Sequence, residues 1–128
     1  MTPSTAVEVA RGFWRLMASN DFYSVQTVLA EEFVLEWPQS KERIRGAERF
    51  ARMNCEYVAH GPWVVTVNRI VGNDIEAVSE VEVTDGVQHG KAISFFTLAG
   101  EKIARIVEYW PEPYAALPDR AHLVEVMQ

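Results

Sequence analysis

The segment VQHGKAISFFTLAGEKIARIVEYW, residues 87–110, consists of two apolar runs joined by a short turn that contains a glycine. Val87–Leu98 and Lys102–Trp110 are rich in valine, isoleucine and aromatic residues, which favour β-strands. Ala99-Gly100 between them is typical of a hairpin turn. The two runs are therefore predicted to pair as antiparallel strands.

Two similar runs precede this hairpin. Residues that favour β-strands are also frequent in Trp63–Val71 and Ile75–Thr84. The turns are provided by Gly72-Asn73-Asp74 and Asp85-Gly86. Connections this short leave no room for crossover helices, so neighbouring strands must be antiparallel. The second half of the chain is predicted to form a four-stranded antiparallel meander.

The first half of the chain shows helical periodicity, with apolar residues at spacings of three and four. Helices are predicted from Ser4 or Thr5 to about Ser19, from Phe22 to about Ala30, and from Gly46 to a point before Gly61-Pro62. A short strand, Phe33–Trp37, is ended by Pro38, and a polar loop continues through Arg45. Helices followed by strands predict an α+β fold.

Length and composition predict a single soluble domain over residues 1–128, with a core of about residues 5–115 and a proline-rich tail, residues 111–128. The net charge of −6 argues against nucleic acid and anionic membranes as partners. The lone Cys55 excludes an intramolecular disulfide and a cysteine zinc cluster, and the three histidines lack metal-ligand spacing. A cytoplasmic protein without metal or cofactor is expected.

A long sheet with helices before it can curl into a cone whose inner face is lined by side chains. Many of the side chains expected on that face are large and aromatic. They are Trp14, Phe33, Trp37, Phe50, Met53, Tyr57, Phe96 and Trp110, with Asn54 as a polar member. Either these residues line a pocket for a small hydrophobic molecule, or they fill a solid core. Asn54 either serves such a pocket or satisfies a backbone carbonyl.

The order of elements, together with LEWPQSKERIRGAERF and FTLAGEKIARIVEYW, resembles the SnoaL-like and ketosteroid-isomerase-like branch of the nuclear-transport-factor-like superfamily. The resemblance spans about residues 5–115. It implies a cone-shaped α+β barrel with a pocket at its open end, and a homodimer formed through the outer face of the sheet. Apolar residues expected on that outer face are Val65, Val67, Ile93 and Phe95.

The best-known reactions of the family are not expected for this chain, because residues that they require are missing. The position of the isomerase base, directly before the proline of the short strand, is Trp37 here. The positions of the oxyanion donors fall on Ser94 and near Phe13 and Trp14, so steroid isomerisation is not expected. The Arg-x-Asp pair of the family's epoxide hydrolases has no counterpart around His89.

The polyketide cyclases of the family use an acid on the last strand, near a polar residue on the preceding strand, and these positions fit Glu108 and Ser94. If Ser94 faces inward, alternation also places Ala92 and Phe96 inside. The facing row would then hold Ala104, Ile106, Glu108 and Trp110. Burial would raise the pKa of Glu108 toward the range useful for proton transfer. A slip of one residue would instead turn Glu108 toward water or toward Arg105 or Arg69.

Two functions remain open from the sequence. The first is a cofactor-independent isomerase, cyclase or hydrolase in which Glu108, assisted by Ser94, moves a proton on a small hydrophobic substrate. The second is a ligand-binding or dimeric scaffold protein that catalyses nothing. Glu80 and Glu82 lie on one face of their strand, opposite the face that carries Ser79, Val81 and Val83. They are predicted to contact solvent or a dimer partner.

Overall fold

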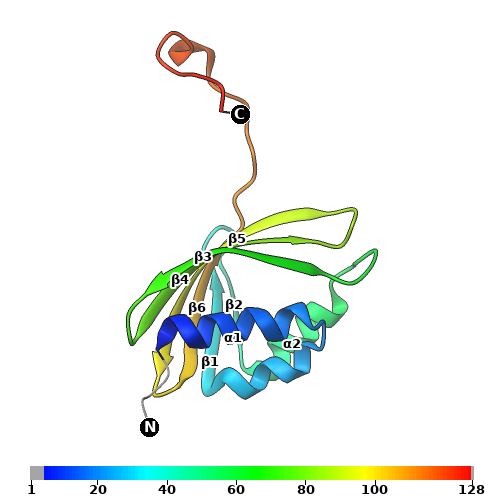
Figure 1. The fold of residues 1–128 in the computed structure, drawn as a ribbon. Helices are drawn as coiled ribbons and strands as arrows, with labels where there is room; N and C mark the ends of the chain where they lie inside the picture. The colour runs from blue at the N-terminus through cyan, green and yellow to red at the C-terminus, as the bar shows by residue number, and fades with distance from the viewer. Residues whose placement is uncertain (1–4, 128) are drawn as a thin grey trace.

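The computed structural model describes residues 5–127 and contains helices packed on one curved six-stranded sheet (Figure 1). The helical elements are α1 (Ala6–Ala18), η1 (Phe22–Val28), α2 (Ala47–Glu56) and η2 (Pro118–Arg120). The strands are β1 (Leu29–Trp37), β2 (Glu42–Arg45), β3 (Val64–Gly72), β4 (Glu76–Thr84), β5 (His89–Ala99) and β6 (Lys102–Tyr109). The strand order is β2-β1-β6-β5-β4-β3. This is the predicted α+β fold.

The antiparallel meander is confirmed, because β3, β4, β5 and β6 pair in sequence order. The sheet also has a part that the sequence did not reveal: β1 lies parallel to β6, on the side away from β5. Within the described residues β2 and β3 form the two edges, so the sheet curves without closing into a barrel. Helices α1 and α2 both lie on one side of it (Figure 1).

The N-terminal helix begins where an N-cap was predicted. The hydroxyl of Thr5 accepts a hydrogen bond from the Glu8 backbone N–H at 3.2 Å, which satisfies one of the free donors at the start of α1. Ser4, the other predicted cap, lies outside the described residues. The second predicted helix is wrong in type, because residues 22–28 form a tight 3-10 helix and Leu29 and Ala30 already belong to β1.

The loop predicted between Pro38 and Arg45 is wrong, because residues 42–45 form the edge strand β2. β2 returns along β1 in a hairpin, with Trp37 opposite Glu42, and Lys41 adopts a positive φ in the turn. The sequence ERIR hid this strand because three of its four residues are charged. Charged side chains are common on edge strands, where they discourage pairing with other chains.

Two predictions of which strand residues face inward are wrong. A bulge between β5 and β6 leaves Ala104 without a partner, so Ile103 rather than Ala104 joins the buried row with Ile106 and Glu108. On β3, Val65 and Val67 pack against the core rather than facing outward as predicted, because they lie opposite the inward Val83 and Val81. Ile93 and Phe95 do lie on the outer face, with Phe95 43% exposed.

The core is built around Phe13 on α1, which is 1% exposed. Its ring lies 5.0 Å from Trp14, 5.9 Å from Phe50 and 5.4 Å from Phe96, measured between centroids. Phe33 extends the cluster, with its ring 5.8 Å from that of Phe50. These edge-on and tilted contacts join α1, α2, β1 and β5 through a continuous aromatic core.

We expect the substitution Phe13→Ala to lower the free energy of unfolding by about 3–5 kcal/mol, because it removes a fully buried ring at the centre of this cluster. Urea denaturation followed by far-ultraviolet circular dichroism measures the change. Tyr23→Ala, at a side chain that is 48% exposed, is the matched control and should cost less than about 1 kcal/mol. Equal losses for the two variants would show that Phe13 does not organise the core.

Candidate functional site

Glu108 lies near the end of β6, on the inner face of the sheet. It is directly opposite Ser94 on β5, and Ser94 is in turn opposite Ser79 on β4. Both serines are fully buried and Glu108 is 6% exposed. The prediction that Glu108 and Ser94 face inward is confirmed, and so are the inward positions of Ala92 and Phe96.

Three neutral donors converge on the Glu108 carboxyl group. The indole N–H groups of Trp37 and Trp110 donate to Oε1 at 3.1 and 3.0 Å, and the Ser94 hydroxyl donates to Oε2 at 2.7 Å. None of the ion pairs among residues 5–127 involves Glu108. The carboxyl group is therefore held by hydrogen bonds without a neighbouring cation.

This environment raises the pKa of Glu108 above its ordinary value, because desolvation by burial outweighs the three hydrogen bonds that lower it. Glu36 and Glu80, which face outward, behave in the opposite way. Hydrogen bonds from Arg43 and Arg105 lower the pKa of Glu36, and hydrogen bonds from Arg69 and Asn68 lower that of Glu80. Burial without a cation thus distinguishes Glu108 from these paired carboxylates.

The two tryptophans come from separate parts of the chain. Trp37 is the last residue of β1, which runs parallel to β6 and so ends beside Glu108, and Pro38 follows it. Trp110 directly follows β6, and its backbone N–H donates to the Gln39 side chain at 2.7 Å. A side chain at Gly90 would meet the Trp110 ring at 3.1 Å, so this glycine makes room for the indole. Both tryptophans are only partly buried, so they lie between the carboxyl group and the surface.

A second buried contact continues the polar row across the sheet. The Trp14 indole N–H donates to the Ser79 hydroxyl at 2.9 Å. The cross-strand neighbours Ser79, Ser94 and Glu108 thus form a polar row on an otherwise apolar face. Neither Ser79 nor Gln39 was predicted from the sequence as a site residue. Ser79 could have been found by aligning β4 against Ser94.

The other predicted site residues divide into two groups. Phe33, Phe50 and Phe96 are buried in the aromatic core, as is Trp14, and their role in ligand binding stays a prediction. On α2 and after it, Met53 packs partly buried against the core, Asn54 donates its side-chain amide to the Phe50 carbonyl at 2.8 Å, and Tyr57 is 56% exposed. None of these side chains touches the Glu108 cluster through a hydrogen bond described in residues 5–127.

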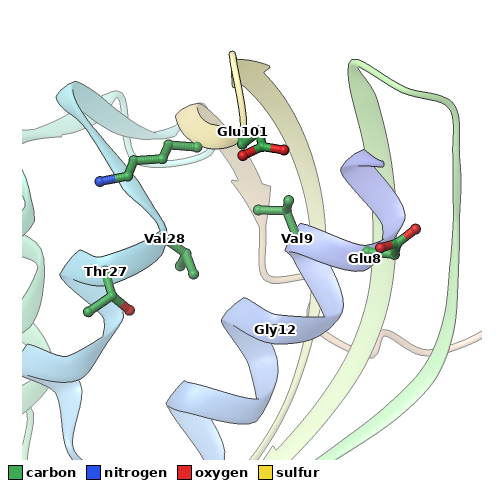
Figure 2. Close-up of a pocket in the computed structure, with 7 residues that line it drawn as sticks. Glu8, Val9, Gly12, Thr27, Val28 and Glu101 are labelled. Carbon is green, nitrogen blue, oxygen red and sulfur yellow. The ribbon is translucent and has the colours of Figure 1, made fainter. Parts of the chain in front are cut away.

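Among the surface hollows of residues 5–127 are two that Glu108 does not line. The first, of about 350 Å³, lies between α1, η1 and the β5–β6 turn, where Val9, Val28 and Glu101 border it (Figure 2). The second, of about 490 Å³, lies beside β1 and the start of α2, between Phe33 and Arg49. Of the residues predicted to line an aromatic pocket, Phe33 alone borders either of these two hollows, so the aromatic pocket stays a prediction.

The SnoaL-like domain family matches residues 10–106 of the chain. The chain belongs to this family. A Kribbella flavida DSM 17836 protein, named as a candidate ketosteroid isomerase, shares 30% identity over 96% of this chain and 90% of its own, with a TM-score of 0.87.

Two more distant structures share the fold of this SnoaL-like chain. An NTF-2-like protein of unknown function from Burkholderia xenovorans LB400 has 20% identity, 94% coverage of both chains and a TM-score of 0.76. An LEH-like epoxide hydrolase from M. tuberculosis has 20% identity, coverage of 83% of this chain and 82% of its own, and a TM-score of 0.66. No curated protein matches the sequence.

The part of the chain that the structure describes has neither a metal-binding cluster nor a membrane-spanning helix. Residues 5–127 contain no group of three or more histidine, cysteine, aspartate or glutamate side chains arranged to hold a metal ion. No helix in the same range has the length and apolar character needed to cross a bilayer.

Glu108→Gln should change how stability depends on pH. The folded state binds a proton at Glu108 more tightly than the unfolded state, whose pKa is near 4.5, so wild-type stability falls as pH rises above 4.5 through the raised pKa. The amide variant lacks this loss and should gain relative stability, by about 1.4 kcal/mol for each unit by which folding raises the pKa.

Urea unfolding from pH 4 to pH 8 measures this difference between the variant and the wild type. Glu42→Gln, on the exposed edge strand β2, is the matched control and should show a difference that does not depend on pH in this way. A difference for Glu108→Gln that stays constant across the range would contradict a raised pKa at Glu108.

Proposed function

We propose that this SnoaL-like protein is a cofactor-independent acid/base catalyst that acts on a small hydrophobic molecule, with Glu108 as the group that moves the proton. The observation that carries the proposal is a buried carboxyl group held by neutral donors alone. Burying a carboxylate without a cation costs free energy that an apolar side chain would not cost. Such a group is therefore better explained by chemistry than by stability.

The donors determine which oxygen of Glu108 takes the proton. An indole N–H can only donate, so Oε1, which accepts from Trp37 and Trp110, must remain an acceptor in both protonation states. A serine hydroxyl can donate or accept, so Ser94 can turn to accept a proton carried by Oε2. Oε2 is accordingly the proton-carrying oxygen, and Ser94 is the residue that adapts to it.

Access to the carboxyl group requires movement of an indole, because Glu108 is only 6% exposed and the partly buried Trp37 and Trp110 cover it. A substrate ring that stacks on either tryptophan would replace part of this cover. An indole N–H released from Oε1 could then donate to an oxygen of the substrate that becomes negative in the transition state. The same tryptophans would thus serve as cover and as hydrogen-bond donors.

The names of the similar structures indicate the type of reaction less clearly than the position of Glu108 does. The Kribbella flavida protein is named as a candidate ketosteroid isomerase, but in this chain Trp37 stands where the sequence analysis placed the base of the steroid isomerases. Glu108 sits on the last strand, which is the position of the acid expected for a cyclase-like reaction. We therefore favour proton transfer from the last strand over steroid isomerisation.

A second function is favoured by the solid aromatic core. Phe13, Phe50 and Phe96 pack ring against ring, so they leave the tryptophans as the adaptable part of the inner face. In this alternative the protein binds a hydrophobic molecule under Trp37 and Trp110 and catalyses nothing. Glu108 would then act only as a hydrogen-bonding group for the ligand.

A ligand screen followed by hydrogen exchange tests the proposal. Thermal shift with steroids, polyketide fragments and fatty lactones would first identify a stabilising compound. We expect the wild type to speed exchange of an acidic C–H of that compound with D₂O, measured by mass spectrometry. Glu108→Gln should still bind the compound but exchange it on the order of 100-fold or more slowly.

Trp37→Phe is the matched comparison, because it keeps an aromatic ring and removes one N–H donor to Oε1. It should retain exchange activity at a reduced rate. Binding by the wild type without any exchange would refute catalysis and support the binding function. Exchange that survives in Glu108→Gln at the wild-type rate would assign the proton transfer to another group.

A further inference from the structure

The last described segment, residues 111–127, forms an arm that projects from the domain. Every residue in it is exposed. Its one regular element is the short 3-10 turn η2, held by local bonds such as that from the Ala121 N–H to the Pro118 carbonyl. Figure 1 shows the arm leaving the sheet on the side opposite helices α1 and α2.

The arm carries more apolar surface than an inert tail requires. Its large apolar residues are Tyr114, Leu117, Leu123, Val124, Val126 and Met127. Leu123 is 77% exposed and Val126 is 87% exposed. Flexible tails are usually poor in such residues, since an exposed apolar side chain gains nothing from water. Burial of these side chains against another surface would recover that free energy.

The match to a solved relative extends into the arm. The match to the Kribbella flavida protein covers 96% of this chain, and that coverage could not be reached if the match ended at Trp110. Holding an extended arm in one conformation costs about 1–2 kcal/mol per residue in backbone entropy, so it needs compensating contacts. The described domain, residues 5–110, does not supply them, because the arm remains exposed along its whole length.

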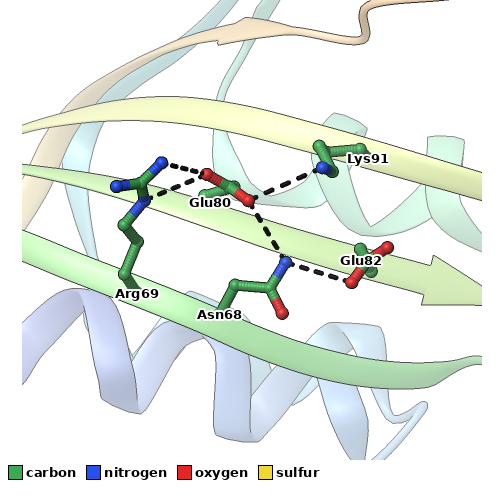
Figure 3. Close-up of polar contacts among 5 residues, drawn as sticks. All are labelled: Asn68, Arg69, Glu80, Glu82 and Lys91. Carbon is green, nitrogen blue, oxygen red and sulfur yellow. Dashed lines mark hydrogen bonds and ion pairs between the residues drawn. The ribbon is translucent and has the colours of Figure 1, made fainter. Parts of the chain in front are cut away.

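The outer face of the sheet suits a second copy of the chain. Phe95 and Tyr109 lie edge to face there, 6.1 Å apart, and are 43% and 36% exposed. Figure 3 shows charged groups of the same face, where Arg69 and Lys91 both contact Glu80. An exposed aromatic pair with a polar border is typical of an interaction surface.

Charge also favours this pairing. The net charge of the chain is −6, so two copies repel each other over most of their surfaces. On the outer sheet face, however, cations slightly outnumber carboxylates. The cations are Arg43, Arg45, Arg69, Lys91 and Arg105, and the carboxylates are Glu36, Glu76, Glu80 and Glu82. The arm is acidic, with Glu112, Asp119 and Glu125 against Arg120.

We propose that residues Pro111–Met127 are an exchange arm that packs on a second copy of this chain across the outer face of the sheet. Each copy extends its arm over the other, so the apolar side chains of the arm become buried only in the pair. The arm starts directly after Tyr109 and Trp110 and extends away from its own domain, so it is free to reach a second copy (Figure 1).

Sedimentation velocity over a range of concentrations tests the role of the arm. The full chain should form a dimer, and the double variant Leu123→Asp and Val126→Asp should raise the dimer dissociation constant on the order of tenfold or more. Ala116→Ser, at an exposed position of the same arm that has neither a large apolar nor a charged side chain, is the matched control and should leave the dissociation constant within about twofold. Equal dissociation constants for all three proteins, or a full chain that stays monomeric, would overturn the proposal.

Paramagnetic relaxation separates exchange between copies from folding back onto the same copy. One chain carries the substitutions Cys55→Ser and Val126→Cys, with a nitroxide attached to the introduced thiol and no ¹⁵N. It is mixed with wild-type chain that is labelled with ¹⁵N and carries no nitroxide. Broadening of outer-face amides such as Phe95 in the ¹⁵N chain can come only from an arm of another copy, and is the expected result. Broadening seen only when the spin label and ¹⁵N are in the same chain would show that the arm folds back on its own domain.

Discussion

The registers of three neighbouring strands determine most of what this protein presents to its interior. Because β4, β5 and β6 pair directly, Ser79, Ser94 and Glu108 lie side by side on the inner face, and their sequence neighbours point outward. A shift of one residue in either hairpin would move Glu108 to the outer face and expose the inner apolar row. The buried carboxyl group and the filled aromatic core are thus consequences of one alignment.

Much of this alignment could be predicted from the sequence. Gly100 has a positive φ in the β5–β6 turn, and this turn brings Ser94 opposite Glu108. The bulge at Ala104 could not be predicted, because a single extra residue leaves no mark in composition and depends on how the strands curve. It lies between the turn and Glu108, yet Glu108 stays inward. The pattern of burial resumes at Ile106.

The sequence could not show that three hydrogen-bond donors meet at the Glu108 carboxyl group, because this depends on the order of strands in the sheet. Trp37 and Glu108 are far apart in the chain and meet only because β1 inserts beside β6 as a parallel neighbour. The sequence of the meander does not predict that β1 pairs with β6. The β1–β2 hairpin, which extends the sheet beyond β1, was also missed, because the residues of β2 are mostly charged. The sequence pointed to Trp37 as an unusual residue, but only the sheet order shows that its indole reaches the carboxyl group of Glu108.

Trp110 connects the candidate site to the exposed arm. Its indole covers Glu108, and its backbone is fixed by Gln39 at the point where the chain leaves the sheet. Pro111 and Pro113 follow at once, and proline restricts the backbone where the arm begins. If binding of the arm to a second copy favours the position in which Trp110 covers the carboxyl group, arm binding and ligand binding are coupled. A ligand that displaces Trp110 must then weaken arm binding by the same factor by which the arm weakens ligand binding, because coupling free energies are reciprocal.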